Sequence, residues 1–441
     1  MKALLQLALG GTLALTACSK SNPYYCEGAP DNNCANTDGG QMGCQKSADC
    51  TNASAPVCDT AAHVCVACGD GETQACMGNT PVCSNHECVA CTSHGDCDSN
   101  VCVLDTGACA GDGEVAYVDP NATDNDVCTR TMPCTKVAKA LATGRPYVKL
   151  QGMTNEQVTV AGKTVALFAD PGAKLTSTTN GIILKVEGAT QLTIHDLEIS
   201  GASGAGNPGI SLQPGNTANV SLYRVTVSGN QGGGITASGG ALALYESTVS
   251  GNQGSGLSLS GVSLTMSRSL VSINRGGGIS ISGTSSFDIT NNFIFRNGDP
   301  DASMFGGVNI GVATPGVNRF EFNTIADNRS SPGTIRAGGV LCDIPGFAGG
   351  NNIIARNAVG GSTTVTNAQT LGQCTYPTSK IQADVTDLAF VSADAAPYNY
   401  KLTAGSSAID QATTSSSINS DYDLDVRPQG GQKDIGADEY K

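Results

Sequence analysis

The chain has 441 residues, a length that excludes a single small module and allows about three domains or one long repetitive domain with attachments. Glycine accounts for 56 residues, tryptophan is absent and charged residues make up only 14%, which disfavours a coiled coil or a charged helical bundle. The formal charge of −14 argues against a nucleic-acid partner, because phosphate contacts require dense lysine and arginine. A hydrophobic fraction of 39% is sufficient for a core, so the composition predicts β structure rich in small residues.

The first residues have the features of an export signal. Met1 and Lys2 precede an apolar run over residues 3–15, which is too short to cross a membrane as a mature helix. The motif Leu-Thr-Ala-Cys at residues 15–18 follows directly and resembles the bacterial lipobox. An ordinary secretory signal with an incidental cysteine is the alternative.

The lipobox resemblance implies a processed, lipid-anchored protein. Residues 1–17 would be the lipoprotein signal peptide, and Cys18 would become the acylated N-terminus. Acyl chains bury methylene groups in a bilayer, so the membrane is the first expected partner. Ser19 stands where inner-membrane retention usually shows aspartate, which implies the outer membrane of a Gram-negative bacterium.

The cysteines also indicate an oxidising compartment, because 18 of the 19 remain, an even number, once Cys18 is set aside. Residues 18–43 form a polar tether with Cys26 and Cys34, and residues 44–112 hold three similar cysteine-rich repeats. Their cysteines are Cys44, Cys50, Cys58 and Cys65, then Cys68, Cys76, Cys83 and Cys88, then Cys91, Cys97, Cys102 and Cys109. Units this small need covalent constraint, so we expect two disulfides in each, with the connectivity open.

Zinc is the alternative for the cysteine-rich repeats. The pairs Cys65 and Cys68, and Cys88 and Cys91, have zinc-knuckle spacing, and histidines lie nearby. Export favours disulfides. The units resemble short cysteine-rich repeats that precede larger domains in lipoproteins of predatory and soil bacteria, which implies a spacer or an interaction stalk.

Residues 113–145 have a different pattern. Residues 115–118 predict a strand, and residues 135–142 predict a short helix with Thr135 as its N-cap. Cys128 and Cys134 are close enough in sequence to form a local disulfide. The stretch resembles the entry cap of bacterial parallel β-helix proteins, and we expect it to act as the N-terminal cap.

Residues 146–376 consist of short runs of Val, Ile, Leu and Thr separated by Gly and Asn, and these runs align with one another. The clearest spacing is 22 residues, as for Val227, Val249 and Val271. Aligned runs end in the asparagines Asn230, Asn252, Asn274, Asn297, Asn328 and Asn357. A unit of this length is too short for a propeller blade and fits one coil of a parallel β-helix.

These repeats resemble the right-handed parallel β-helix proteins of the pectate-lyase-like superfamily. The predicted fold is therefore all-β, a single-stranded right-handed parallel β-helix (solenoid) preceded by a small disulfide-rich repeat region. Alternation within a strand sends Val220 and Leu222 inward. We expect the asparagine series to be a structural ladder, because Asn tolerates left-handed backbone and can bond to the coils above and below.

The same resemblance implies a polysaccharide lyase or a glycoside hydrolase as one function class. A lyase needs a basic residue that abstracts a proton, usually beside acid-bound Ca²⁺, whereas a hydrolase needs paired carboxylates. The sequence has no lysine between Lys185 and Lys380. His195 is the only histidine of the repeats, and we expect a solvated contact with Asp196. We therefore predict no catalytic residues, with a carbohydrate-active enzyme as the alternative.

Two surface series are candidate binding residues. Tyr223 and Tyr245 are 22 residues apart and should stack beside charged residues of the same spacing, as a sugar-binding platform or as a stabilising ladder. The second series adjoins the ladder asparagines and comprises Arg275, Arg296, Arg329 and Arg356. Four guanidinium groups along one turn could hold an anionic glycan through bidentate contacts, and neutralisation by nearby aspartates is the alternative.

Residues 377–441 resemble the closing segment of secreted bacterial β-helix proteins, which implies a C-terminal cap over the last coil. Cys342 and Cys374 are expected to pair before it. Asp421, Asp423 and Asp425 begin like a Ca²⁺ loop, although Gly and Glu are missing from the later positions that such a loop requires.

We expect an ion pair between Arg427 and Asp434 inside the closing segment, with Ca²⁺ as the alternative use of its acids. No other cofactor is predicted. The sequence as a whole predicts an exported, lipid-anchored cell-surface protein whose non-catalytic β-helix binds a polysaccharide or a surface protein.

Overall fold

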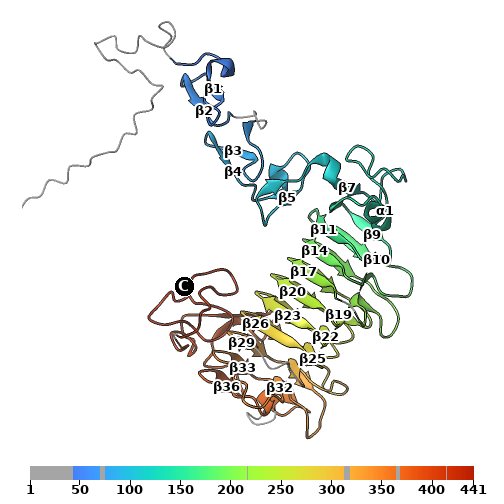
Figure 1. Cartoon of the computed structure of the whole chain (residues 1–441). Coiled ribbons are helices and arrows are strands. Elements are labelled where there is room, and N and C mark those ends of the chain that lie inside the picture. The colour runs from blue at the N-terminus through green and yellow to red at the C-terminus, as the bar shows by residue number, and fades with distance from the viewer. Residues whose placement is uncertain (1–42, 70–74, 216, 312–317, 364–367, 414) are drawn as a thin grey trace, which may run out of the picture. The chain divides into compact units, whose positions relative to one another are not determined.

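The computed structural model describes residues 43–69, 75–215, 217–311, 318–363, 368–413 and 415–441 (Figure 1). The expected signal peptide, Cys18, and the tether cysteines Cys26 and Cys34 lie outside the described residues. The chain divides into two compact units between Ala110 and Gly111. Among the helices of the described ranges, none combines the length and apolar character needed to cross a membrane.

The first unit contains the cysteine-rich repeats, each built on one antiparallel hairpin. The paired strands are β1 (Val57–Asp59) with β2 (Val64–Val66), β3 (Val82–Ser84) with β4 (Glu87–Val89), and β5 (Cys102–Val103) with β6 (Ala108–Cys109). Short 3₁₀ helices, η1 (Ser47–Asp49) and η3 (His94–Asp96), precede the hairpins of the first and third repeats. These repeats therefore have almost no secondary structure beyond a hairpin, as expected of units held by covalent bonds.

Each cysteine-rich repeat carries two disulfides, which join its first cysteine to the third and its second to the fourth. The bonds are Cys44–Cys58, Cys50–Cys65, Cys68–Cys83, Cys76–Cys88, Cys91–Cys102 and Cys97–Cys109. The nearby His63 and His86 direct their Nδ1 atoms to the backbone carbonyls of Cys44 and Cys68. These sulfurs are therefore committed to disulfides, which settles the alternative between zinc and disulfides for the described cysteines.

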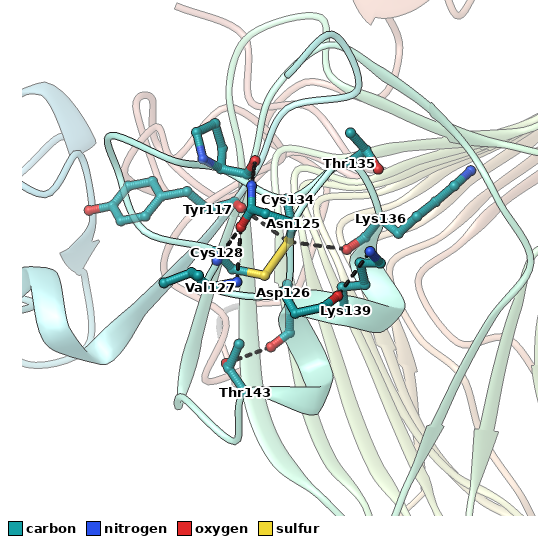
Figure 2. The surroundings of a disulfide bond; sticks show 12 residues. Tyr117, Asn125, Asp126, Val127, Cys128, Cys134, Thr135, Lys136, Lys139 and Thr143 are labelled. Carbon is teal, nitrogen blue, oxygen red and sulfur yellow. Dashed lines mark hydrogen bonds and ion pairs between the residues drawn. A yellow bond between two sulfur atoms is a disulfide. The ribbon is translucent and has the colours of Figure 1, made fainter. Parts of the chain in front are cut away.

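The N-terminal cap consists of strand β7 (Val115–Val118) and helix α1 (Val137–Ala142), with the disulfide Cys128–Cys134 between them (Figure 2). The expected cap residue was wrong, because the helix begins two residues after Thr135. Thr135 instead bonds to Asp124, and the Glu156 carboxylate accepts the free N–H groups of Val137 and Ala138. A carboxylate from the first coil thus fixes the helix N-terminus and matches its dipole.

The solenoid winds through three parallel sheets, which we call sheets A, B and C. Sheet A orders β7, β8 (Tyr147–Leu150), β11 (Thr164–Ala169), β14 (Gln191–His195), β17 (Asn219–Tyr223), β20 (Ala241–Tyr245), β23 (Ser263–Ser267), β26 (Ser286–Thr290) and β29 (Arg319–Glu321). Sheet B orders β9 (Met153–Asn155), β12 (Lys174–Thr176), β15 (Glu198–Ser200), β18 (Thr226–Ser228), β21 (Thr248–Ser250), β24 (Leu270–Ser272), β27 (Phe293–Phe295), β30 (Thr324–Ala326), β33 (Ile353–Ala355) and β36 (Lys380–Gln382). Sheet C orders β10 (Val158–Ala161), β13 (Leu184–Glu187), β16 (Pro208–Leu212), β19 (Gly233–Ser238), β22 (Leu257–Ser260), β25 (Ile279–Ser282), β28 (Val308–Ile310), β32 (Val340–Cys342) and β35 (Thr370–Gly372).

One apolar core runs inside the coils, which confirms the predicted all-β parallel solenoid. In β17 the side chains alternate, and Val220 and Leu222 are almost completely buried. Val227, Val249 and Val271 pair in register on successive coils of sheet B, so identical side chains stack inside the core. Period-2 alternation in short strands explains why the sequence pattern identified this fold.

The six ladder asparagines form a continuous column of buried side chains. Each Nδ2 donates to the Oδ1 of the next asparagine, at 2.8–2.9 Å from Asn230 to Asn357, and Gln369 ends the column. The residue before each asparagine has positive φ, as at Gly251 (64°) and Arg296 (53°). The ladder therefore saturates the polar groups of a left-handed corner that repeats on every coil.

A second column runs parallel to the first, five residues earlier in each coil. It contains Asn292, Asn323 and Asn352, linked by the same amide-to-amide bonds, and serines occupy the equivalent positions in neighbouring coils. These asparagines are completely buried. Two ladders, rather than the single ladder predicted, hold the two ends of each sheet B strand.

The closing segment packs against the side of the solenoid. It contains the hairpin β37 (Phe390–Ser392) and β38 (Asn399–Leu402), and it covers the outer face of β27, β30 and β33. In Figure 1 it lies beside the last coils. The partly buried residues packed against the last part of the core belong instead to residues 344–381, where the disulfide Cys342–Cys374 lies. The expected cover over the last coil is thus mainly a lateral support, because the outer face of these coils is apolar.

A short parallel pair outside the three sheets, β31 (Arg329–Ser330) with β34 (Ala358–Val359), lies on the longer late coils. These strands follow the ladder positions Asn328 and Asn357 directly. The longer coils thus add backbone pairing at the corner that the ladder defines.

Candidate functional site

A groove lies where the closing segment meets the solenoid. Its cavity volume is about 430 Å³, and its lining comes from two parts of the chain that are far apart in sequence. We call it the cap groove and define it by Leu270, Phe293, Phe295, Val391, Ser392, Pro397, Tyr398, Asn399, Tyr400, Lys401 and Tyr422. Pockets of about 300–1,000 Å³ with mostly apolar and aromatic walls are typical of ligand sites.

The solenoid wall of the cap groove follows from the sequence of β27. Ile294 points into the main core, so alternation directs Phe293 and Phe295 outward. Exposed phenylalanines on consecutive outward positions would form an apolar patch. The closing segment covers them until only 5% of Phe293 and 7% of Phe295 remain exposed.

The opposite wall is aromatic as well. Tyr422 contacts Phe293 edge to face at a centroid distance of 4.7 Å, and Tyr400 packs on Phe295 at 4.5 Å. The Arg296 guanidinium lies 3.6 Å from the centroid of the Tyr398 ring, in cation–π geometry. Edge-to-face and cation–π contacts have preferred geometries, so they hold these rings in fixed orientations.

A buried polar network fixes the base of the cap groove. The Tyr400 hydroxyl donates to Asp327, and Arg356 forms a bidentate pair with the same carboxylate. Burial, followed by the nearby Asp327 charge, raises the pKa of the Tyr400 phenol. Arg356 also binds Asp394 of the closing segment at 2.6 Å. These bonds attach the closing segment to the corner of the coils.

The candidate Ca²⁺ residues are only partly brought together. Carboxylate oxygens of Asp421 and Asp423 converge with one of Asp438 within 4.8 Å, whereas Asp425 pairs with Lys441. Asp421 accepts backbone N–H bonds through both oxygens, and Asp423 pairs with Lys401 at 2.7 Å. The acids are therefore already bonded within the protein.

The closing segment buries several acids at a cost to their ionisation. Burial raises the pKa of Asp438 to about 6, and the nearby charges of Asp421 and Asp423 contribute to the same direction. The expected partner of Arg427 was wrong. Arg427 pairs with Glu439 at 2.9 Å, with both side chains fully buried, and takes only the backbone carbonyl of Asp434.

The structure does not bring the four candidate arginines into one row. Arg296 and Arg356 precede their ladder asparagines, whereas Arg275 and Arg329 follow theirs, so they form two columns on opposite sides of the ladder. Arg296 and Arg356 face the closing segment through Ala393 and Asp394. Sequence spacing alone concealed this because both offsets place an arginine beside an asparagine.

The other two arginines are exposed. Arg275 pairs with Asp299 at 2.6 Å. The backbone N–H of Asp301, followed by the Arg275 guanidinium, lowers the pKa of Asp299. Arg329 has no carboxylate within ion-pair distance in the described part of the chain, which leaves it as a solvated charge.

Tyr223 and Tyr245 stack at a centroid distance of 5.0 Å, and the stack extends further than the sequence indicated. His195 lies 4.8 Å from Tyr223, and Phe168 lies 4.7 Å from His195, with all these rings nearly parallel. The expectation that His195 is solvated was wrong, because only 5% of it is exposed. Beside the stack, cross-coil ion pairs join Arg224 to Asp196 and Arg268 to Glu246.

The acids of the solenoid are committed to structural contacts. Ion pairs join Asp170 to Lys149, Glu187 to Lys185, Asp196 to Arg224, Glu198 to Lys174, Glu246 to Arg268, Asp288 to Arg319, Asp299 to Arg275 and Asp327 to Arg356. Glu156 caps α1, and Glu321 accepts a bond from Ser416. Paired acids on separate coils are an arrangement typical of cross-strand stabilisation.

Comparisons with known proteins agree with this architecture. Residues 208–376 match the family described as "Right handed beta helix region", and residues 12–115 match a "Family of unknown function (DUF8331)". The first match lies inside the solenoid and identifies its right-handed β-helix repeat. A search of curated proteins gave no match.

Two solved structures are similar to the chain at low identity. A crystal structure of pectate lyase Pel9A has 14% identity and a TM-score of 0.46, and the alignment covers 74% of this chain and 96% of that chain. The Dettilon tailspike protein (gp208) has 12% identity and a TM-score of 0.28, with coverage of 65% and 71% respectively.

The sequence analysis did not identify the cap groove. Its aromatic residues Tyr398, Tyr400 and Tyr422 lie outside the repeats, so no periodicity connects them to Phe293 and Phe295. A usable signal was present in β27, where three large apolar residues follow one another although alternation leaves one face outward. Such a run in a solenoid strand indicates that another segment covers that coil.

Proposed function

We propose that this chain is an exported surface protein that displays a non-catalytic β-helix for binding, with a glycan as its ligand. One observation carries the proposal. Eight acids of the solenoid form ion pairs with lysine or arginine, so they stabilise coils rather than form an acid–base pair around a substrate. A long, rigid and nearly uncharged surface then remains as the functional feature.

The disulfide-rich region supports display at a distance from the anchor. Its three repeats are small units held by two disulfides each, which suits an extracytoplasmic spacer. In this proposal Cys18 is acylated in the outer membrane and the cysteine-rich repeats separate the solenoid from the bilayer. Cys18→Ser should release the protein from the membrane fraction, and membrane retention of that variant would argue against the anchor.

Binding is tested with immobilised polysaccharides. The full oxidised chain carrying Cys18→Ser is applied to neutral and acidic polysaccharides in the presence of Ca²⁺, and retention is compared with bovine serum albumin. Selective retention on at least one glycan is the expected result. No retention on any polysaccharide would contradict glycan binding and would favour a protein partner.

A further inference from the structure

The cap groove combines two chemical features that match a sugar ring. Tyr398 and Tyr422 are half-buried and present aromatic surface, while Ser392, Asn399 and Lys401 bring hydroxyl, amide and ammonium groups to the same lining. A pyranose ring has an apolar face of C–H groups and a rim of hydroxyls. Aromatic faces beside hydrogen-bonding groups are therefore complementary to both parts of such a ring.

The charges of the cap groove indicate which kind of sugar fits. Lys401 is the cation of the lining, and Asp423 neutralises it at 2.7 Å. The adjacent Arg296 lies on the Tyr398 ring and donates to the Ala393 carbonyl. A polyuronate would need cations free to bind its carboxylates. The groove therefore favours an uncharged glycan over an acidic one.

The walls are held in place before any ligand arrives. The Tyr400 hydroxyl is bonded to Asp327, and the Tyr400 ring packs against Phe295 and Phe390. At the opposite wall, Tyr422 packs against Phe293 and its backbone N–H donates to Ala437. Binding to a preorganised wall loses less conformational entropy than ordering a mobile loop.

We propose that the cap groove binds a pyranose unit of an uncharged glycan, with its C–H face on Tyr398 and Tyr422. This inference rests on the proposed function and specifies its site and ligand class. The groove opens where Val391 is 53% exposed, so a longer chain can extend past the bound unit into solvent. The solenoid thus supplies one wall of the site and the closing segment the other.

The test uses calorimetric titration of the full oxidised chain carrying Cys18→Ser. Hexasaccharides of uncharged glucose, mannose and xylose polymers are compared with a hexasaccharide of galacturonate. Tyr398→Ala and Tyr422→Ala should each weaken binding of an uncharged hexasaccharide roughly tenfold, the scale of one lost aromatic contact. The conservative variants Tyr398→Phe and Tyr422→Phe keep the ring and should retain binding.

Two further variants guard against trivial results. Val391→Arg changes an exposed residue at the rim and should obstruct the groove without removing a packed ring. Tyr245→Ala removes a tyrosine from the separate aromatic stack and should leave binding unchanged. Thermal unfolding of each variant establishes that it is folded, and Val391→Arg decides the matter if the alanine variants are not.

The outcomes separate the two proposals. Binding that survives all groove variants, or that only Tyr245→Ala weakens, would overturn the cap groove as the site while glycan binding stands. Binding of the galacturonate hexasaccharide alone would overturn the ligand class. Absence of binding by the parent chain to every hexasaccharide would overturn both proposals. Weakening confined to the groove variants would support them.

Discussion

The side-chain amide of Asn252 donates a hydrogen bond of 2.8 Å to the side-chain oxygen of Asn274, which lies 22 residues later on the next coil. The same Asn252 amide also donates to the backbone carbonyl of Val227. Each ladder side chain therefore satisfies a buried backbone group and a buried neighbour at once. The column links every coil from Asn230 onward to the next through amides that solvent does not reach.

Replacement of one ladder residue should have a large effect on stability. Asn274→Ala removes the acceptor for Asn252 and the donor to the carbonyl of Val249, and it leaves buried polar groups without partners. We expect the free energy of unfolding to fall by about 2–4 kcal/mol, measured by chemical denaturation. Gln253→Ala changes an exposed residue beside the ladder and should cost less than about 0.5 kcal/mol. Equal effects of the two changes would contradict a structural ladder.

The attachment of the closing segment depends on Asp327. Asp327 is 8% exposed and accepts bonds from Arg356 and Tyr400, so Asp327→Asn should destabilise the protein by roughly 2 kcal/mol. Protease cleavage between residues 377 and 390 should become faster, because the segment detaches more often. Glu246→Gln alters a more exposed cross-coil pair and should cost less than about 1 kcal/mol. Unchanged cleavage in Asp327→Asn would show that the apolar contacts alone hold the segment.

The stability of the closing segment should also depend on pH through Asp438. Its pKa is about 6 in the folded protein against 3.8 for the unperturbed group, so the folded state holds this proton more tightly than the unfolded chain does. The stabilising contribution of the protonated carboxyl is therefore complete below about pH 4 and is lost as pH rises through 6.

Asp438→Asn should remove this dependence. Relative to the parent protein, the variant should gain on the order of 2 kcal/mol between pH 4 and pH 7, because it carries no charge to bury. Urea denaturation at pH 4, 5, 6 and 7 measures the difference. Asp425→Asn, at a separate ion pair with Lys441, provides the matched control. A parallel pH profile for Asp438→Asn and the parent would contradict the raised pKa.

Reduction should separate the two compact units by their source of stability. The cysteine-rich repeats have few buried apolar side chains, whereas the solenoid has a continuous apolar core. Dithiothreitol should therefore expose residues 44–109 to proteolysis and leave a resistant fragment that contains most of residues 111–441. Mass spectrometry of the fragments identifies them. Loss of both units on reduction would show that Cys128–Cys134 or Cys342–Cys374 is needed by the solenoid.

Much of the fold was predictable because the solenoid repeats its own interactions. A column such as Val227, Val249 and Val271 requires the same residue type at a fixed interval, so the physical contact leaves a periodic record in the sequence. The aromatic stack shows where this method fails. His195 pairs with Tyr223 across 28 positions, because the early coils are longer than 22 residues. A search at one period therefore found Tyr223 and Tyr245 but missed His195.

The candidate site was not predictable for a different reason. Contacts such as Tyr400 with Asp327 join a repeat to a segment that does not repeat, so neither partner constrains the spacing of the other. The arginine series illustrates the related limit of register. Arg275 and Arg296 each adjoin a ladder asparagine, but a shift from one side of the corner to the other changes their surroundings entirely. Local offsets within a corner are decided by backbone conformation.

The most direct test of the central claim follows the length of a polysaccharide and its association with protein in one experiment. The full oxidised chain carrying Cys18→Ser is incubated with neutral and acidic polysaccharides and Ca²⁺, and the mixture is separated by size exclusion. Non-catalytic binding predicts polymer of unchanged length that co-elutes with protein. Progressive shortening of any polymer would contradict the account and would establish a carbohydrate-active enzyme.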